Sequence, residues 1–394
     1  MVAIHIDHNN TPSLEADGQT IIEMSPPIAI IGGGQVVSLL LGFLNATTLT
    51  TSFMNETPLP PMNSRALKAA GLFDEFKKYA RWDATTTLVL DKNGTTHLVF
   101  GQDRDAPEID RAALRKLLLD SIPPHKIIWG HSVSTVERDE NGELVIAFAD
   151  GSSVSGFRLV IGADGAWSKV RHLLTPASPR YSGKHYIEGR ITTQNPFHRL
   201  LSDKIGRGSL ISMGDGKQIS AQRQGDGSYR IYLGLSVAEN FTTNGDIDLV
   251  TDTGEAARSL LVSEDGFFAD WAPELKGFVT NSEGPLRAWP LYHMPSEALC
   301  WERSPGVALV GDAAHVSTPF VGEGVNCSMY DSLVLVGKIA EYGLDKLDEA
   351  TVEYERDMFL RGKDLIDRSN GSAVLLFAQD APKPLLEVIA RSKG

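Results

Sequence analysis

The stretch GDAAHVSTPFVGEGVN, residues 311–326, decides the fold. It follows the apolar run Val307–Val310, which predicts a buried strand with Asp312 at its end. A carboxylate there can accept a hydrogen bond from a sugar or polyol hydroxyl. The turn at Gly322 and Gly324 predicts the start of a helix, whose first N–H groups stabilise negative charge. The stretch therefore indicates a ligand-binding strand–turn–helix unit, and an unrelated turn of the same shape is the alternative.

A glycine triplet near the start of the chain predicts a second turn of this kind. Gly32, Gly33 and Gly34 follow the strand-like run at residues 27–31 and precede a potential helix. Glycines in this position let the backbone approach a pyrophosphate, whose charge lies at the helix N-terminus. Val37 occupies the place of the third glycine of the usual G-x-G-x-x-G pattern. A plain turn is therefore the competing interpretation.

A third turn lies in the stretch RLVIGADGAWSKVR, residues 158–171. Its apolar part predicts a buried strand, and Asp164 follows this strand in a turn of small residues. Ser168 is placed to cap a basic helix after the turn. A capped strand–helix turn without a ligand is the alternative.

Strand–turn–helix units thus lie toward both ends of the chain, and a β-rich region lies between them. This order predicts an α/β protein in which a discontinuous Rossmann-like nucleotide-binding domain contains an inserted β-sheet domain. The expected segments are a polar leader at 1–26, the nucleotide-binding domain at 27–180 and 291–366, the inserted sheet domain at 181–290, and a C-terminal helical segment at 367–394.

Composition restricts the class of protein. The 394 residues include 37 basic and 50 acidic side chains, a formal charge of −13 that disfavours nucleic acid and anionic membranes as partners. The two cysteines, Cys300 and Cys327, give neither a disulfide framework nor a metal-ligand cluster. The sequence shows no signal peptide and no apolar run long enough to cross a bilayer. We expect a soluble, cytoplasmic and monomeric protein without a metal site.

The sequence contains none of the common nucleophile–base motifs, since neither G-x-S-x-G nor H-E-x-x-H occurs. His315, three residues after Asp312, is interpreted as structural, because a lone histidine beside a turn is more often structural than catalytic. No catalytic side chain is therefore assigned, and a bound cofactor is expected to carry the chemistry.

From about Ile28 to Ile366 the sequence resembles the class A flavoprotein monooxygenases, and within them the tetracycline-destructase-like branch. The turn at Asp164 resembles the DG motif of this family, and residues 311–326 resemble its GD motif, which contacts the ribityl chain of FAD. Arg111 matches the arginine that reaches the flavin cofactor. The residues that this resemblance assigns to FAD are Gly32, Gly34, Arg111, Asp164, Asp312, Gly322, Gly324 and Asn326.

The resemblance implies an FAD-dependent monooxygenase with NADPH as transient reductant and O2 as co-substrate. It would hydroxylate or epoxidise a small electron-rich organic molecule in secondary metabolism. Substrate contacts are expected from the inserted sheet, with Trp289 and Phe320 as candidates to line a ring-stacking face. The candidates for these contacts are Gln222, Arg223, Tyr232, Trp289 and Phe320.

The chain departs from the family pattern in the region that binds adenosine. Met54 stands where family members carry an acidic residue, and Val37 replaces a glycine. Either residues 45–62 reflect a gene-model artefact, or the chain has lost tight FAD binding. The second explanation leaves a flavin-independent descendant open, which would catalyse a redox-neutral cyclisation or bind a hydrophobic ligand. An FAD-linked oxidase or reductase is a third possibility.

Overall fold

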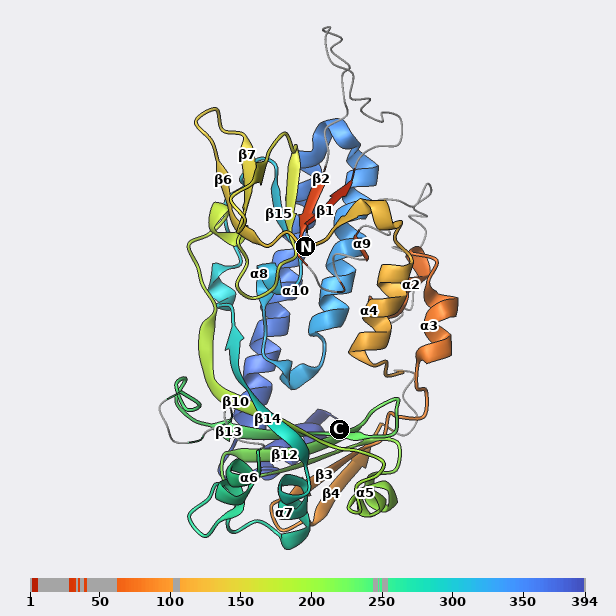
Figure 1. Ribbon diagram of the computed structural model, residues 1–394, viewed down its shortest axis with the longest axis vertical. Coiled ribbons are helices and arrows are strands. Elements are labelled where there is room, and N and C mark those ends of the chain that lie inside the picture. The colour runs from red at the N-terminus through yellow and green to blue at the C-terminus, as the bar shows by residue number, and fades with distance from the viewer. Residues whose placement is uncertain are drawn as a thin grey trace, which may run out of the picture. The chain divides into compact units, whose positions relative to one another are not determined.

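The computed structural model describes residues 2–5, 28–32, 35, 39–40, 62–101, 107–243, 247, 249 and 254–392 (Figure 1). The chain divides into two compact units. The first unit contains the described residues up to Lys78 together with Arg111–Arg180 and His293–Arg368. The second unit contains Tyr79–Asp110, Tyr181–Tyr292 and the residues from Ser369 onward.

This division differs from the expected segments in two places. Residues 79–110, expected in the nucleotide-binding domain, belong to the second unit, and so does most of the C-terminal segment. The cause is the pairing of β3 (Thr87–Asp91) with β11 (Ser209–Gly214), which are parallel neighbours in one sheet. A strand pair more than 100 residues apart leaves no local pattern in the sequence.

The first unit is built on a five-stranded sheet of order β15-β9-β2-β1-β5. Its strands are β1 (Val2–His5), β2 (Ile28–Ile31), β5 (Ile127–Ile128), β9 (Leu159–Gly162) and β15 (Val307–Leu309). The strands β2, β9 and β15 are parallel, and all their residues are buried. The continuous apolar runs seen in the sequence are therefore central parallel strands covered on both faces.

Strand β1 corrects one expectation. Residues 1–26 were expected to form a polar leader, but β1 lies between β2 and β5 and is antiparallel to both. The sequence VAIH is a short strand-forming run, and the polarity of the segment that follows it concealed this signal.

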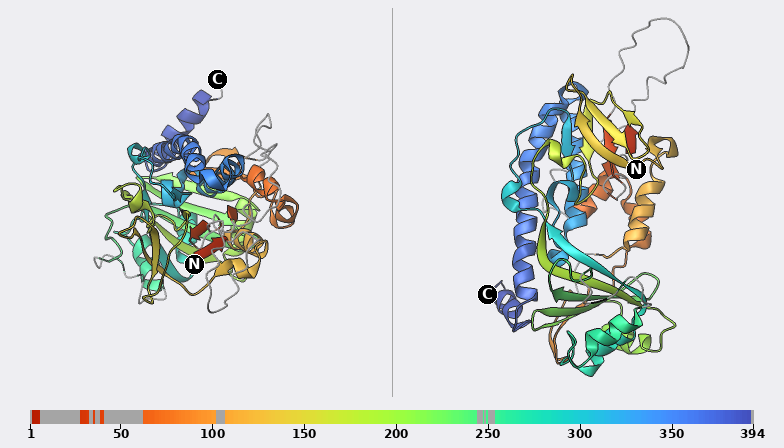
Figure 2. Two further views of the ribbon diagram at one scale, coloured as in Figure 1. Left: turned by 90° about the horizontal axis from the view of Figure 1, so that it is seen from above. Right: turned by 60° about the vertical axis from the view of Figure 1, so that its left-hand side comes forward.

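The first unit also contains helices. They are α2 (Met62–Ala69), α3 (Phe73–Tyr79), α4 (Arg111–Asp120), α8 (Asp312–His315), α9 (Gly324–Tyr342) and the long α10 (Leu347–Leu376), which continues into the second unit. Short 3-10 helices are η2 (Pro124–Lys126), η3 (Arg171–Leu173), η4 (Ser296–Ala298), η5 (Pro319–Val321) and η6 (Leu344–Lys346). Figure 2 shows α9 and α10 side by side, and a hydrogen bond from Arg361 to Asp331 joins them.

A small antiparallel sheet completes the first unit. It consists of β6 (Val133–Arg138), β7 (Leu144–Phe148) and β8 (Ser153–Val154). These three consecutive strands are antiparallel and form a meander. The meander leads the chain into β9 of the central sheet.

The second unit is built on a seven-stranded sheet of order β14-β10-β13-β12-β11-β3-β4. The strands not yet given are β4 (Thr96–Phe100), β10 (Arg180–Ile191), β12 (Lys217–Arg223), β13 (Tyr229–Ser236) and β14 (Glu283–His293). One face of this sheet packs against α5 (His198–Ile205), α6 (Glu255–Val262) and α7 (Pro273–Thr280). The last helix, α11 (Lys383–Ser392), also belongs to this unit.

The core of the second unit covers one face of its sheet. Ile187, Ile219 and Leu233 lie on adjacent strands and are almost fully buried against Trp271 and Phe278. Because successive strand residues point to opposite faces, the residues between them lie on the other face. That face carries polar and aromatic side chains, described below.

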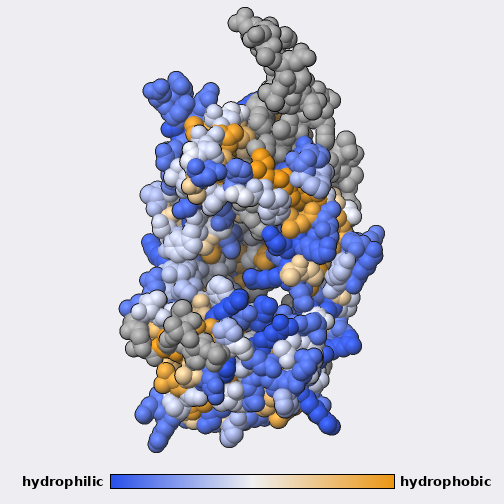
Figure 3. Space-filling view, viewed as in Figure 1, coloured by the Kyte–Doolittle hydropathy of each residue, from blue (hydrophilic) through white to orange (hydrophobic). Residues whose placement is uncertain are grey.

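Among the described helices, none is long and apolar enough to cross a membrane. Figure 3 shows mainly hydrophilic side chains on the face that it draws, with apolar side chains in small groups.

Candidate functional site

The first element of the site is the turn that carries Asp312. Gly311 links β15 to α8 with φ 61° and ψ −140°, a conformation that side-chain-bearing residues rarely adopt. Asp312 follows directly, and its side chain retains exposed surface. Desolvation by the surrounding protein nevertheless raises the pKa of Asp312, and the charges of His315, Arg111 and Arg171 oppose this effect. The structure thus places an exposed carboxylate with several charged neighbours at the end of a central strand, and the sequence predicts this position.

Asp164 lies at the end of the neighbouring strand β9. One carboxylate oxygen, Oδ2, accepts a hydrogen bond of 2.6 Å from the Lys169 N–H. The other, Oδ1, is buried and has no hydrogen-bond partner among the described residues. Ser168 Oγ accepts hydrogen bonds from the N–H groups of Val170 and Arg171, and the segment that follows is the short η3 rather than a longer basic helix. Asp164 Oδ1 is therefore an acceptor that a bound ligand can satisfy.

Arg171 forms hydrogen bonds with both acidic turns, the one at Asp164 and the one at Asp312. Its guanidinium donates to the carbonyl oxygens of Asp312 at 2.9 Å and Ala313 at 2.7 Å, and to that of Ala166 at 2.6 Å. A longer bond of 3.5 Å reaches the carbonyl of Gly165. Arg171 is 4% exposed, and burial lowers its pKa while the charges of Asp164 and Asp312 oppose this effect. One buried cation therefore fixes the relative position of both motif turns.

Sequence reasoning did not assign a role to Arg171. The residue stands at the end of the quoted stretch 158–171, but its partners in the Asp312 turn lie about 140 positions later. The sequence signal for this role of Arg171 is a basic residue at the end of a turn of small residues.

The start of α9 supplies the third element. Gly322 precedes this helix, and no side chain caps its first turn. Apart from the adjacent residues of the chain and the backbone of α9, no described atom lies within 4 Å of a Cβ built on Gly322 or on Gly324. Asn326 lies in the first turn and is half-buried. Because the first N–H groups of a helix have no partner within the helix, this end of α9 can bind negative charge.

Arg111 connects this site to the N-terminal part of the chain. It begins α4, is exposed, and acts electrostatically on Asp312. Its carbonyl accepts a hydrogen bond of 3.1 Å from Gln35, which lies shortly after the glycine triplet. Gly32 ends the buried run that starts with β2, whereas Gly34, Val37 and Met54 lie outside the described residues. The first unit therefore brings Arg111, Asp164 and Asp312 into one region.

Three of the substrate candidates lie on two different faces of the second unit's sheet. Gln222 and Tyr232 lie on the polar face of the second unit's sheet, because Tyr232 pairs with Ser220 two positions before Gln222. Arg223 points to the opposite face, where its guanidinium lies 5.4 Å from the ring centre of buried Tyr229. Gln222 and Arg223 therefore lie on opposite faces of the sheet, since strand neighbours alternate between faces.

The two remaining candidates belong to different units. Trp289 is on β14 of the second unit and is 48% exposed. Phe320 is in η5 of the first unit and is half-buried.

The polar sheet face carries charged partners that the sequence did not reveal. Glu108 accepts hydrogen bonds from Gln222 at 3.1 Å and from Arg81 at 3.3 Å, and desolvation raises the pKa of Glu108. On the same face, Arg230 lies 3.5 Å from a Glu188 carboxylate oxygen. The rings of Tyr186 and Tyr232 lie 5.5 Å apart on the paired strands β10 and β13. This face therefore combines aromatic surface with paired charges.

Comparisons with known proteins agree with this arrangement. The FAD binding domain family model matches residues 285–369. The monooxygenase penA of Penicillium thymicola is 31% identical over 426 residues, which covers 92% of this chain and 98% of penA. The crystal structure of Klebsiella pneumoniae HpxO complexed with FAD and uric acid superposes with a TM-score of 0.69 at 20% identity, covering 93% of this chain and 91% of the other. The tetracycline destructase Tet(55) gives a TM-score of 0.63 at 14% identity over 90% of each chain.

Proposed function

Because the chain belongs to the class A FAD-dependent monooxygenases, we propose that it uses NADPH and O2 to hydroxylate or epoxidise a small electron-rich organic substrate. The enzyme is an oxidoreductase, and FAD is its cofactor. The observation that carries the proposal is the pair of acidic turns held by Arg171 beside the uncapped start of α9.

The residues of the first unit fit FAD. Asp164 Oδ1 is a buried acceptor without a described partner, and Asp312 adds a second acceptor at the end of β15. Both would accept hydrogen bonds from hydroxyl groups of the cofactor. The first N–H groups of α9 would stabilise negative charge on it, and Arg111 would add a cation. Once bound, FAD supplies the redox chemistry with O2, so that no protein nucleophile is required.

The second unit would orient the substrate. Tyr186 and Tyr232 offer aromatic surface, and Gln222 and Arg230 offer hydrogen-bond donors on the same sheet face. Aromatic rings bind flat apolar groups, and a few polar side chains fix their orientation. These contacts support an aromatic substrate that carries hydroxyl, amino or ring-nitrogen groups. A role in secondary metabolism, a cytoplasmic location and a monomeric state remain predictions from the sequence.

Oxygen labelling tests this function. The purified protein with FAD and NADPH would be incubated under 18O2 with a panel of phenols, anilines and nitrogen heteroaromatics, and products would be analysed by mass spectrometry. We expect one labelled oxygen atom in the product for each NADPH consumed with a true substrate. Parallel incubations under 16O2 and without NADPH are the controls.

The other outcomes distinguish the alternatives. Hydrogen peroxide formation without label in any organic product would indicate an FAD-linked oxidase instead. Conversion of a substrate without FAD, NADPH or O2 would indicate redox-neutral chemistry and would contradict the proposal.

A further inference from the structure

A buried carboxylate lies behind the Asp312 turn and contacts both of its ends. Asp331 Oδ2, from α9, accepts a hydrogen bond of 2.9 Å from the Gly311 N–H and one of 2.6 Å from His315 Nε2. Its other oxygen, Oδ1, accepts a hydrogen bond of 2.8 Å from Arg361 on α10. The side chains of His315 and Asp331 are fully buried. Asp331 therefore ties the residue before Asp312, the last residue of α8 and the helix α10 to one point.

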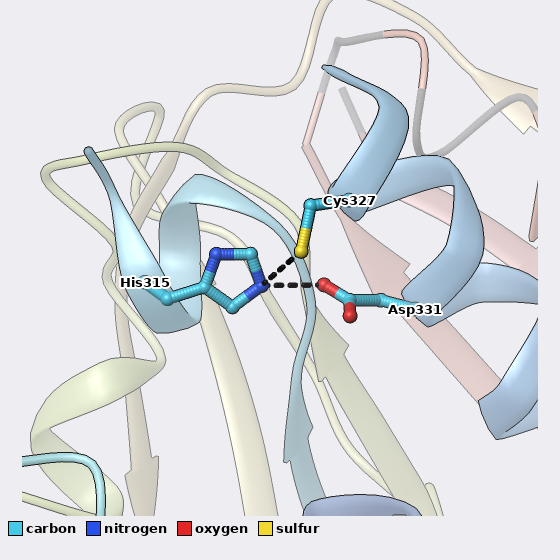
Figure 4. Close-up of side chains that lie close together, drawn as sticks. All are labelled: His315, Cys327 and Asp331. Carbon is cyan, nitrogen blue, oxygen red and sulfur yellow. Dashed lines mark hydrogen bonds and ion pairs between the residues drawn. The ribbon is translucent and has the colours of Figure 1, made fainter. Parts of the chain in front are cut away.

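The cluster does not have the geometry of a metal site. Cys327 Sγ lies 3.9 Å from His315 Nε2, so that Cys327, His315 and Asp331 offer three donor atoms close together (Figure 4). However, the guanidinium of Arg361 already neutralises the Asp331 carboxylate. A metal cation would be repelled by this guanidinium and would have to displace the Gly311 N–H from the same carboxylate. The donors are therefore already used by protein groups.

The cluster is not a nucleophilic triad either. In such a triad the histidine receives the nucleophile's proton at one ring nitrogen and donates from the other to a carboxylate. Here Cys327 and Asp331 both face the same nitrogen, Nε2, as Figure 4 shows. His315 Nδ1 has no hydrogen-bond partner among the described residues. The histidine consequently cannot relay a proton from the thiol to the carboxylate.

Asp331, His315 and Arg361 form a cluster of charged groups, here called the clamp. Although burial alone would lower it, Asp331 and Cys327 raise the pKa of His315 well above its ordinary value. Burial would raise the pKa of Asp331, but His315 and Arg361 lower it below its ordinary value. The carboxylate is thus ionised between two cations, and charge-assisted hydrogen bonds of this kind are about twice as strong as neutral ones.

Helix α10 also contacts His315 and the end of β15. A Cβ on Gly362 would lie 2.9 Å from His315 Cβ and 2.7 Å from Leu299 Cδ2, so only glycine permits this close contact. Eight residues before it, Tyr354 donates a hydrogen bond of 2.8 Å to the carbonyl of Leu309, the last residue of β15. The strand end, the turn and the clamp are therefore all held by one helix.

We propose that Asp331 is a positioning residue for the cofactor: by holding Gly311 and His315 it sets the location of the Asp312 carboxylate and hence the affinity for FAD. This inference rests on the proposed function, because it assumes that Asp312 contacts FAD. Asp331 acts through the turn, whereas Asp312 acts on the cofactor. The bond to Asp331 also gives the buried His315 a structural role beside the turn.

The test compares FAD affinity and fold stability in the variant Asp331→Asn. Asparagine has nearly the same shape, but its single carbonyl oxygen cannot accept the three bonds that the carboxylate accepts. We expect the Kd for FAD, measured by flavin fluorescence quenching well below the Tm of each apoprotein, to rise about 10- to 100-fold. At saturating FAD, kcat should change less than about 3-fold, because the positioning role concerns binding rather than the reaction.

Glu355→Gln is the matched control. Glu355 is another buried carboxyl of the first unit, and it accepts a hydrogen bond of 2.8 Å from Trp301 rather than contacting the turn. Its replacement should leave the Kd for FAD within about 2-fold of wild type. This control separates the clamp from a general effect of losing a buried carboxylate.

Each outcome of these measurements either supports or contradicts the inference. A folded Asp331→Asn protein whose Kd for FAD matches wild type would overturn it. If Asp331→Asn does not fold, His315→Gln decides, because glutamine keeps a donor but lacks the charge; an unchanged Kd in that variant would also overturn the inference. If wild-type protein itself binds no FAD, the proposed function fails first, and this result is distinct from an Asp331 effect.

Discussion

Replacement of Arg171 tests whether one buried cation holds the two acidic turns together. In Arg171→Ala, the carbonyl groups of Ala166, Asp312 and Ala313 lose donors at 2.6–2.9 Å, and that of Gly165 loses a weaker one at 3.5 Å. Carbonyl groups left buried without donors cost free energy, and the removed side chain leaves a cavity.

The size of the effect follows from these contacts. A hydrogen bond from a charged group contributes roughly 1.5–3 kcal/mol, and bonds within one group are not additive. Three short bonds therefore predict a loss of about 4 kcal/mol in the free energy of unfolding of the first unit, near the upper end for single substitutions. Arg171→Lys keeps the charge but not the planar fork, and we expect a loss of about 2 kcal/mol.

Urea denaturation of the full chain measures this loss. Tryptophan fluorescence follows both units, and a probe of FAD release identifies the transition of the first unit, since the two units need not unfold together. The Kd for FAD should rise in parallel with the loss in stability. An Arg171→Ala protein that unfolds within 1 kcal/mol of wild type, or a lysine variant that equals wild type, would refute the reasoning.

Three further predictions concern single side chains. Burial raises the pKa of Glu355 from 4.5 to about 7. The unfolded chain therefore loses this proton first, and the contribution of Glu355 is lost as pH rises from about 4.5 to 7. Glu355→Gln should thus gain up to about 3 kcal/mol relative to wild type at pH 8 but not at pH 4, measured as the difference in Tm across pH; equal differences at both pH values would count against it. Asp312→Asn should weaken FAD binding about 10-fold by titration without a comparable loss in Tm, and a matching drop in Tm would indicate a structural role instead. Tyr354→Phe removes the hydrogen bond to the Leu309 carbonyl and should cost about 1–2 kcal/mol in urea denaturation, whereas an unchanged midpoint would show that this bond is not needed.

Local patterns predicted the parts of the site that are built from consecutive residues. The turns at Asp164 and Asp312 follow buried parallel strands in the structure, and α9 begins at Gly324 as the glycine-rich turn indicates. Each of these features depends on residues within one strand–turn–helix unit. The sequence was therefore sufficient for them.

Features that depend on distant residues could not be predicted in this way. Arg171 bonds to a turn about 140 residues later, and β3 pairs with β11 across a similar distance. The sheet face on which Gln222 or Arg223 lies depends on the strand register, which the sequence does not show, and a shift of one residue reverses it. The Asp331 clamp unites three elements whose contact only the fold reveals.

The central claim, that this chain binds FAD, is tested most directly by the visible absorption spectrum of the purified protein. The protein would be mixed with excess FAD and passed through a gel-filtration column. The account predicts oxidised-flavin absorption bands that elute with the protein at about one FAD per chain, despite the departures at Val37 and Met54 from the pattern that the resemblance implies. A colourless protein after this treatment would contradict the account and favour a flavin-independent descendant.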